Sequence, residues 1–350
     1  MYQLIQLSPK ALKEKGQAAQ TTKEKRQYQT ALFIRSLLIV LFAIIFISFY
    51  TFLFGGENSS VAVGAFCMLL GIRFVPFGYE IKESLVGLSV SLGLMFLGSV
   101  INGLNQPFLS LLVNFLAIFL ILLLTSQEPL MGNGGIYTFS YLFISYTPVS
   151  GELLKQRCYA LAFTFLICGI VLFRNHRKKF QNIKWVDFLK AFSLKNPVSH
   201  WQLRLAFGVS TGLFLGEWLG LEKVVWVGYA CMSVLLPFGE RLHGRALRRV
   251  AGVLCGSLIW LVFYPTLPEN LVFLVGPVAG LWLGFSATYF WTTVLNCFGG
   301  LLLASSLYGS TPAVFFRIQN NFLGAVYALF LFLIIELFWN WKQKKIPTKN

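Results

Sequence analysis

Charged residues are scarce in this sequence. Only 12% of its 350 residues are charged, whereas 56% are hydrophobic, and soluble proteins carry roughly 25% charged residues. This composition excludes a disordered chain, argues against an ordinary soluble domain, and indicates a protein whose solvent is largely lipid. Acidic residues are the scarcest: 13 Asp and Glu stand against 29 Lys and Arg. Because the basic residues lie between apolar runs, their excess indicates membrane topology rather than nucleic-acid binding.

Sequence motifs for metal, nucleotide or covalent chemistry are also missing. The 6 cysteines lie in apolar stretches, with neither a CxxC pair nor a Cys/His group at zinc spacing, so we interpret them as small buried hydrophobic residues. The 3 histidines are scattered over basic segments. A phosphate-binding loop and a Ser/His/Asp arrangement are both absent from the sequence. We therefore expect no metal, no cofactor and no enzymatic activity.

Long apolar runs dominate instead. The charge-free interval 84–127 would form a helix of ~66 Å at ~1.5 Å per residue, twice the ~30 Å hydrocarbon core of a bilayer. It must therefore hold two passes, and the same argument divides 270–316. The first run is longer than a signal-peptide core, so we expect it to be retained. The predicted passes are 32–54, 60–76, 84–103, 108–126, 133–148, 157–173, 202–221, 224–238, 246–264, 269–285, 287–308 and 319–341.

Basic residues predict the topology of these passes. Most Lys and Arg residues fall in the N-terminal arm, in 174–204, in 239–249 and after Trp341. With about twelve passes and a cytoplasmic N-terminus, all four segments lie on the cytoplasmic side, as the positive-inside rule requires. Both termini are then cytoplasmic, in a multi-pass protein of the cell's inner membrane.

Five segments follow from this pattern. One of them, the basic linker 174–201, carries apolar residues at near-helical spacing beside lysines. This pattern suits either a short helix in the membrane interface or a plain connector. The segments are 1–31, a basic N-terminal arm; 32–173, a first six-helix membrane region; 174–201, the basic linker; 202–341, a second six-helix membrane region; and 342–350, a basic tail.

Several short motifs occur twice in the same order. The pattern V-G-x-x-C-M stands at 63–68 and 227–232, Pro-Phe-Gly at 76–78 and 237–239, and Thr-Pro at 147–148 and 311–312. Their similar offsets indicate a duplication. Because each half has an even number of passes, the second keeps the orientation of the first. We therefore predict an all-α membrane protein made of two parallel six-helix repeats, related by an axis along the membrane normal.

The second half carries a family resemblance. A Trp at 226 and a Pro at 237 precede Arg245, Arg248 or Arg249, Gly252 and Gly256. This segment resembles the R-x-x-R-x-x-G-T-x-x-G pattern of the fusaric acid resistance-like family, the aromatic acid exporters. The family's R-x-x-D-T-x-x-G segment is similar to the sequence from Arg317 to Gly324, where Asn320 replaces the Asp. The resemblance implies export of organic, often aromatic, carboxylates, and a more distant similarity links the six-pass unit to plant malate channels.

Two arginines stand apart from the cytoplasmic basic groups. Arg157 and Arg317 each follow a Thr-Pro pair, whose Pro148 or Pro312 we expect to break a helix. We predict that both guanidinium groups face each other across the repeat interface and bind the substrate carboxylate. The alternative is that they extend to outer lipid headgroups. Further polar contacts to the substrate would come from Gln319, Asn320 and Asn321.

Other charged residues have two interpretations each. The basic cluster near 245 is either a topology signal alone or a cytoplasmic funnel for anions or lipid headgroups. Glu217 and Glu336 either bind a coupling proton or extend to the membrane interface. Gly252 and Gly256 form a G-x-x-x-G pattern that favours close helix packing. The members of the basic cluster are Arg241, Arg245, Arg248 and Arg249.

Three functions remain compatible with the sequence. The first is a secondary exporter of small organic anions driven by the proton motive force. The second is a passive anion channel, and the third is a membrane scaffold for envelope assembly. The expected partners are a small organic anion and membrane lipids, with no nucleic acid, and a homodimer is left open.

Overall fold

The structure, a computed structural model, describes residues 1–236 and 242–344, and the backbone alone from 338 onward. Every regular element within these residues is a helix. The α-helices are α1 (Tyr2–Ile5), α2 (Pro9–Ala18), α3 (Thr22–Phe54), α4 (Ser59–Ile72), α5 (Ile81–Asn102), α6 (Pro107–Thr125), α7 (Asn133–Ser145), α8 (Glu152–His176), α9 (Trp185–Ala191), α10 (Pro197–Trp218), α11 (Val225–Leu235), α12 (Leu242–Phe263), α13 (Val275–Phe285), α14 (Tyr289–Tyr308) and α15 (Ser310–Lys344). The 3-10 helices are η1 (Gly56–Asn58), η2 (Pro129–Met131), η3 (Tyr264–Thr266) and η4 (Glu269–Leu274).

Seven helices in the described part of the chain are long and apolar enough to cross a membrane. The shortest, α6, has 19 residues and would span ~28 Å, close to the ~30 Å hydrocarbon core. The most apolar window of α3 is only 6% buried. So large an exposed apolar surface is stable in lipid rather than in water. The chain is therefore a multi-pass membrane protein.

Each of the twelve predicted passes coincides with a helix, but several helices are short. The second, fifth, eighth and tenth passes correspond to α4, α7, α11 and α13, with 14, 13, 11 and 11 residues. At ~1.5 Å per residue they measure ~16–21 Å, less than the hydrocarbon core. In the tenth pass, η4 occupies the first 6 residues of the predicted segment and α13 the remaining 11. The twelve-pass count and the cytoplasmic termini stay predictions.

The chain forms two compact units. Unit 1 contains residues 1–48 and 247–321, and unit 2 contains 49–236, 242–246 and α15 from residue 322 onward. The helices α3, α12 and α15 each contribute to both. These units do not coincide with the two sequence halves, because the first helix of each half packs against a helix of the other half.

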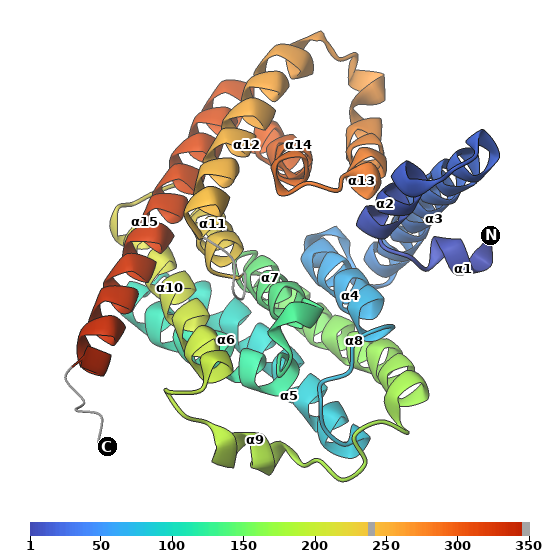
Figure 1. Ribbon diagram of the computed structural model, residues 1–350. Helices are drawn as coiled ribbons and strands as arrows, with labels where there is room; N and C mark the ends of the chain where they lie inside the picture. The colour runs from blue at the N-terminus through green and yellow to red at the C-terminus, as the bar shows by residue number, and fades with distance from the viewer. Residues whose placement is uncertain (237–241, 345–350) are drawn as a thin grey trace. The chain divides into compact units, whose positions relative to one another are not determined.

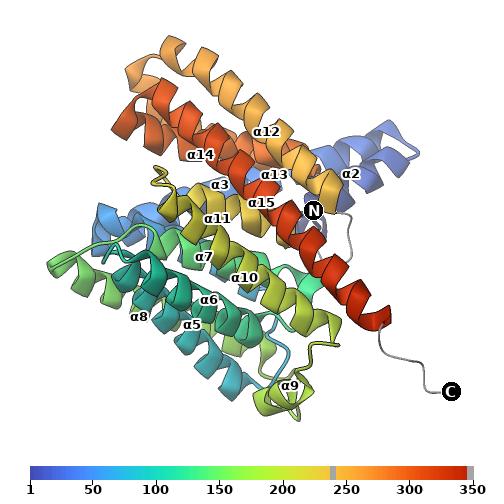
Figure 2. The same cartoon turned by 90° about the vertical axis from the view of Figure 1, so that its left-hand side faces the viewer.

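The two halves therefore exchange their first helices. In unit 2, the exchange brings α10 from the second half onto α6 from the first. Figure 2 shows α6 between α5 and α10, and both neighbours contact it extensively. The rings of Phe108 and Phe214 lie 5.1 Å apart. Gln202 on α10 donates a hydrogen bond to the backbone oxygen of Leu122 at 3.2 Å. Aromatic packing and a buried side-chain amide therefore attach the second half to the first.

In unit 1, α3 from the first half packs on α13 from the second, and α13 lies beside α14 (Figure 1). The rings of Phe33 and Phe285 lie 6.2 Å apart. A Cβ atom added at Gly284 would lie 2.5 Å from the Oγ atom of Ser36. Only glycine allows the two helices to approach this closely.

Equivalent helices make equivalent contacts in the two halves. The third helix of the first half, α5, packs on the fifth and sixth helices, α7 and α8. The third helix of the second half, α12, likewise contacts its fifth and sixth, α14 and α15. The exchange of first helices is also reciprocal, α10 onto α6 and α3 onto α13. These pairings agree with a duplicated arrangement, and the superposition of the halves stays a prediction.

The predicted linker contains a helix of seven residues, α9. Phe188 from α9 lies 6.2 Å from the ring of Tyr79, and the backbone nitrogen of Glu80 donates to the oxygen of Ile183 at 2.9 Å. Burial raises the pKa of the Tyr79 hydroxyl, which donates a hydrogen bond to Leu124. The linker is therefore attached to the segment between α4 and α5, and its location in the membrane interface stays a prediction.

Candidate anion-binding site

One face of α15 carries three polar residues. Arg317, Asn320 and Asn321 have exposed fractions of 5%, 1% and 0%. Their spacing places them on one side of the helix, because an α-helix turns once every 3.6 residues. Gln319, the fourth predicted binding residue on this helix, is exposed and does not join them.

Arg249 from α12 reaches the same face. Its Nε and Nη2 atoms donate to Oδ1 of Asn321 at 3.1 and 2.8 Å, and its side chain is 7% exposed. The Nδ2 atom of Asn321 donates in turn to the backbone oxygen of Arg317 at 2.9 Å. Asn321 is thus held from both ends and fixes Arg249 beside the turn of α15 that carries Arg317. We call Arg249, Arg317, Asn320 and Asn321 the arginine cluster.

The helix α14 provides the third side of the cluster. The Nη2 atom of Arg317 donates to the backbone oxygen of Asn296 at 3.3 Å. Tyr289, the first residue of α14, is hydrogen-bonded to Arg249, and the positive charges of Arg249 and Arg317 repel each other. The two guanidinium groups are therefore held close together by three helices despite their like charge.

Close packing of α12 on α14 holds the cluster in position. A Cβ atom at Gly252 would lie 2.9 Å from Cβ of Thr293, and one at Gly256 would lie 2.7 Å from the backbone oxygen of Val294. Side chains larger than hydrogen would push the helices apart. The packing role predicted for the G-x-x-x-G pattern is confirmed. The close packing of α12 on α14 brings Arg249, which lies one turn before Gly252 on α12, alongside the first turns of α14.

The surroundings of the two guanidinium groups contain hardly any acidic residue. The helices α12, α13 and α14 have neither Asp nor Glu. The acidic residue of α15, Glu336, is exposed and lies ~28 Å from Arg317 along the helix at 1.5 Å per residue. Buried charges are costly unless an opposite charge or hydrogen bonds compensate them. An anion placed between the arginines would add an opposite charge to the hydrogen bonds that the protein supplies.

Unit 1 also contains an apolar cavity of about 360 Å³. Ligand pockets usually measure ~300–1,000 Å³. Helices α12, α13 and α14 line the cavity, with aromatic walls from Phe263, Trp282 and Phe298. Of these helices, α12 carries Arg249 of the arginine cluster and α14 contacts the cluster. Unit 1 thus combines positive charge with an aromatic-lined space.

Arg157 occupies a different environment, in unit 2. It is fully buried and donates five hydrogen bonds, all to uncharged protein groups. The acceptors include Oδ1 of Asn58 at 2.9 Å and the backbone oxygens of Thr147 and Ile144 at 2.6 and 3.2 Å. Those backbone oxygens lie at the C-terminal end of α7, where the helix dipole is negative and favours a cation. Arg157 therefore ties α8 to the end of α7, and its pairing with Arg317 stays a prediction.

The two prolines act at helix ends rather than as breaks within helices. Pro148 lies in the connection after α7, which ends at Ser145, and Pro312 is the third residue of α15. A helix tolerates proline in its first turn because those N–H groups have no intrahelical acceptor. Pro312 thus lies in the first turn after the interruption between α14 and α15, and its role in breaking the helix stays a prediction. Arg157 and Arg317 also lie beyond the first turns of their helices, since α8 and α15 begin earlier than predicted.

A family model described as fusaric acid resistance protein-like matches residues 210–331. The matched segment, about a third of the chain, is similar to this family. The match indicates a membrane transport protein, and it confirms the resemblance found in the sequence. Comparison with the curated proteins and with the solved structures gives no match.

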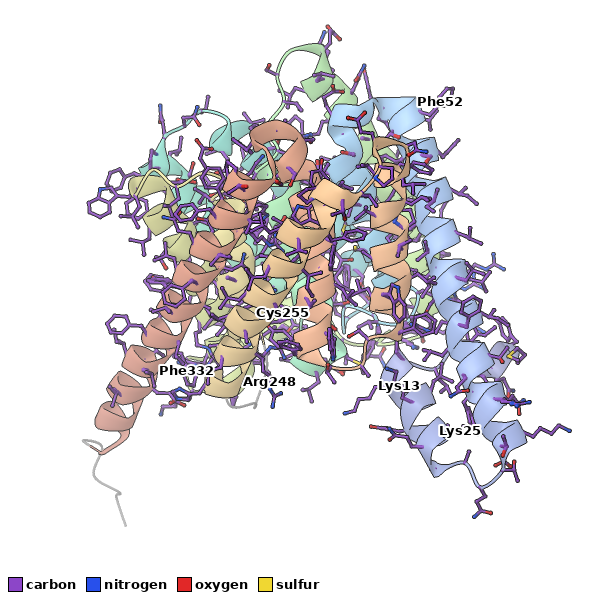
Figure 3. All side chains as sticks on the ribbon, turned by 90° about the horizontal axis from the view of Figure 1, so that it is seen from above. Lys13, Lys25, Phe52, Arg248, Cys255 and Phe332 are labelled. Atoms are coloured by element: carbon purple, nitrogen blue, oxygen red, sulfur yellow. The ribbon has the colours of Figure 1, made fainter. Side chains whose placement is uncertain are left out.

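All four residues of the arginine cluster lie within the fusaric acid resistance protein-like segment, whereas Arg157 lies outside it. The four arginines predicted to form a cytoplasmic funnel do not share one environment, since Arg249 belongs to the buried arginine cluster. Arg245 donates to the backbone oxygen of Ser233 at 3.0 Å, at the end of α11. Arg248 is exposed, as are Lys13 and Lys25. Figure 3 shows these three residues of unit 1 along one edge. Arg241 lies outside the described residues.

Sequence reasoning missed the contact between Arg249 and Asn321. A signal was available in the helical spacing of α12, because Arg245, Arg249, Gly252 and Gly256 recur at intervals of four, three and four residues. Arg248 falls off this face. Since the glycines mark the face that packs closely, the arginine that shares their face is the one directed into the protein.

Proposed function

We propose that this chain is a secondary transporter that exports small organic carboxylates, aromatic ones among them, across the cytoplasmic membrane by using the proton motive force. The observation that carries the proposal is the arginine cluster: two buried guanidinium groups among helices with hardly any acidic residue. Arginine holds a carboxylate through two parallel hydrogen bonds. Asn320 and Asn321 supply neutral polar groups beside it.

The depth of the cluster supports a transport role. Arg249 is the eighth residue of α12 and Asn321 is the twelfth of α15, so each lies ~10–16 Å from the start of its helix. We expect such positions to lie inside the ~30 Å core, and transporters bind their substrates near the midplane. Positive charge at this depth is costly without a function.

The apolar cavity supports an aromatic substrate. A benzene ring bearing a carboxylate has one charged group for an arginine and an apolar body for a space lined by aromatic side chains. The aliphatic carboxylates would lack the second interaction. We therefore expect aromatic acids to be transported in preference to aliphatic acids of equal charge.

Flux into proteoliposomes tests the function. Phthalate is a suitable probe because it is an aromatic carboxylate whose two charges slow its passage through bare bilayers. We expect the purified protein to concentrate phthalate against its gradient when a pH gradient is imposed, and to stop when an ionophore dissipates that gradient. Equilibration with a steady current and no accumulation would indicate a channel, and flux no faster than in protein-free liposomes would indicate a scaffold. Either result would overturn the proposal.

A further inference from the structure

A second polar group, distant in sequence from most of the arginine cluster, lies within unit 2. The hydroxyl of Tyr146 donates to Oε1 of Glu217 at 2.7 Å. The Nδ2 atom of Asn114 donates to the hydroxyl of Tyr146 at 3.0 Å, and the hydroxyl of Tyr141 donates to Oδ1 of Asn114 at 2.6 Å. Asn102 exchanges hydrogen bonds with Asn114 at 3.2 and 3.4 Å. Four helices, α5, α6, α7 and α10, therefore contribute to one hydrogen-bonded chain that ends on a carboxyl group.

This chain runs from the protein interior toward an accessible end. Tyr141 and Asn114 are 0% and 1% exposed, whereas Tyr146 and Glu217 are partly exposed. Among the described residues, none with a basic side chain lies within ion-pair distance of Glu217. The helices α6, α7 and α11, which surround this end of α10, contain no Lys, Arg or His. The nearest charged residues along the chain, Glu222 and Lys223, belong to the loop after α10.

A proton is the smallest ligand that can neutralise a carboxylate in such surroundings. Its negative charge is costly in an apolar environment without a cation, whereas the protonated carboxyl is neutral. The hydrogen bond from Tyr146 stabilises the charged form, so the site can exist in both states. Glu336, the other acidic residue considered for this role, is exposed and has no comparable network among the described contacts.

The position of the network fits proton entry from outside. Glu217 is the last residue but one of α10, Asn102 is the last residue of α5, and Tyr146 follows α7 directly. These helices are the third, fifth and seventh predicted passes, which all run outward under the positive-inside rule. Their C-terminal ends meet in this network. The outer side is the one from which the proton motive force delivers protons.

We propose that Glu217 is the proton-binding residue that couples export to the pH gradient, with Tyr146 and Asn114 as positioning residues. The step is the reversible addition of one proton to the carboxylate, without covalent or redox chemistry. This inference rests on the proposed function and adds the coupling ion and its binding group. It assigns anion binding to unit 1 and proton binding to unit 2.

Phthalate accumulation with matched variants tests the coupling. For one proton exchanged per anion at zero voltage, a step of one pH unit gives about tenfold accumulation. We expect Glu217→Gln to lose this accumulation and to make phthalate exchange at equal pH insensitive to pH. Tyr146→Phe should move the midpoint of the exchange pH profile to higher pH, because the carboxylate loses its hydrogen-bond donor. The control, Glu222→Gln, alters a nearby exposed carboxyl and should behave as the wild type.

Infrared spectroscopy of the full-length protein provides a readout that does not depend on transport. One pH-dependent component of the carboxyl C=O band should be present in the wild type and in Glu222→Gln and absent from Glu217→Gln, in which the other carboxyl groups of the protein still titrate. Unchanged pH-driven accumulation or an unchanged titrating band in Glu217→Gln would overturn the inference while leaving the proposed function intact. Accumulation that follows a sodium gradient rather than a pH gradient would overturn it as well. Failure of the wild type to transport phthalate would instead refute the proposed function.

Discussion

At the scale of single residues, the neighbouring groups distinguish two buried arginines that look alike in the sequence. Arg157 and Arg317 follow similar Thr-Pro pairs, yet Arg157 donates its hydrogen bonds to neutral protein groups. Arg317 is held instead beside a second arginine. The first arrangement stabilises helix ends, whereas the second concentrates positive charge.

Replacement of Arg157 tests this distinction. We expect Arg157→Gln to lower the free energy of unfolding by roughly 2–4 kcal/mol, because several charge-assisted hydrogen bonds are lost and buried acceptors remain. Thermal unfolding in detergent measures the effect. Lys155→Gln is the matched control, since its ion pair with Glu152 is exposed and contributes at most ~1 kcal/mol. Equal melting temperatures for the two variants would contradict a stabilising role for Arg157.

At the scale of helices, much was predictable from the sequence. Charge-free runs located all twelve helical segments, because lipid-facing helices must be apolar throughout. Helix ends were predicted less well: α15 begins at Ser310, nine residues before the predicted pass. The residues between the predicted passes 287–308 and 319–341 were expected to form a connection, but 310–318 lie within a helix whose polar face is buried. Hydropathy cannot distinguish a helix with a buried polar face from a loop, because the polar residues lower the mean hydropathy equally in both.

The contact between α12 and α14 gives a prediction at this scale. We expect Gly256→Ala to destabilise unit 1, because its Cβ would meet the backbone of α14, which cannot move without shifting the helix. Gly299→Ala on α14 is the control, since a Cβ there meets nothing within 4 Å and removal of a helix glycine stabilises by up to ~1 kcal/mol. Opposite shifts in melting temperature are expected. A rise for both variants would show that α12 and α14 are not closely packed.

At the scale of the whole chain, the two halves exchange their first helices. The pattern of short motifs predicted two similar halves, but each half was expected to form its own membrane region. Pairing of α10 with α6 and of α3 with α13 depends on contacts between residues far apart in the sequence, such as Gln202 with Leu122, 80 positions apart, and Gln202 with Ser126, 76 positions apart. Sequence periodicity carries no information about which of two similar partners a helix selects. For the same reason, the approach of Arg249 to Asn321 emerged only from the folded chain.

The central claim is that the arginine cluster binds the transported anion. Phthalate flux into proteoliposomes containing Arg317→Gln, compared with Arg248→Gln, tests it most directly, because the control removes the same charge from an exposed position on α12. We predict that Arg317→Gln slows flux by at least about thirtyfold, since loss of a buried charge-assisted contact costs roughly 2–5 kcal/mol. Arg317→Lys should recover part of the flux, and Arg248→Gln should retain nearly all of it. Flux at the wild-type rate in a folded Arg317→Gln variant, or an equal loss in Arg248→Gln, would contradict the account.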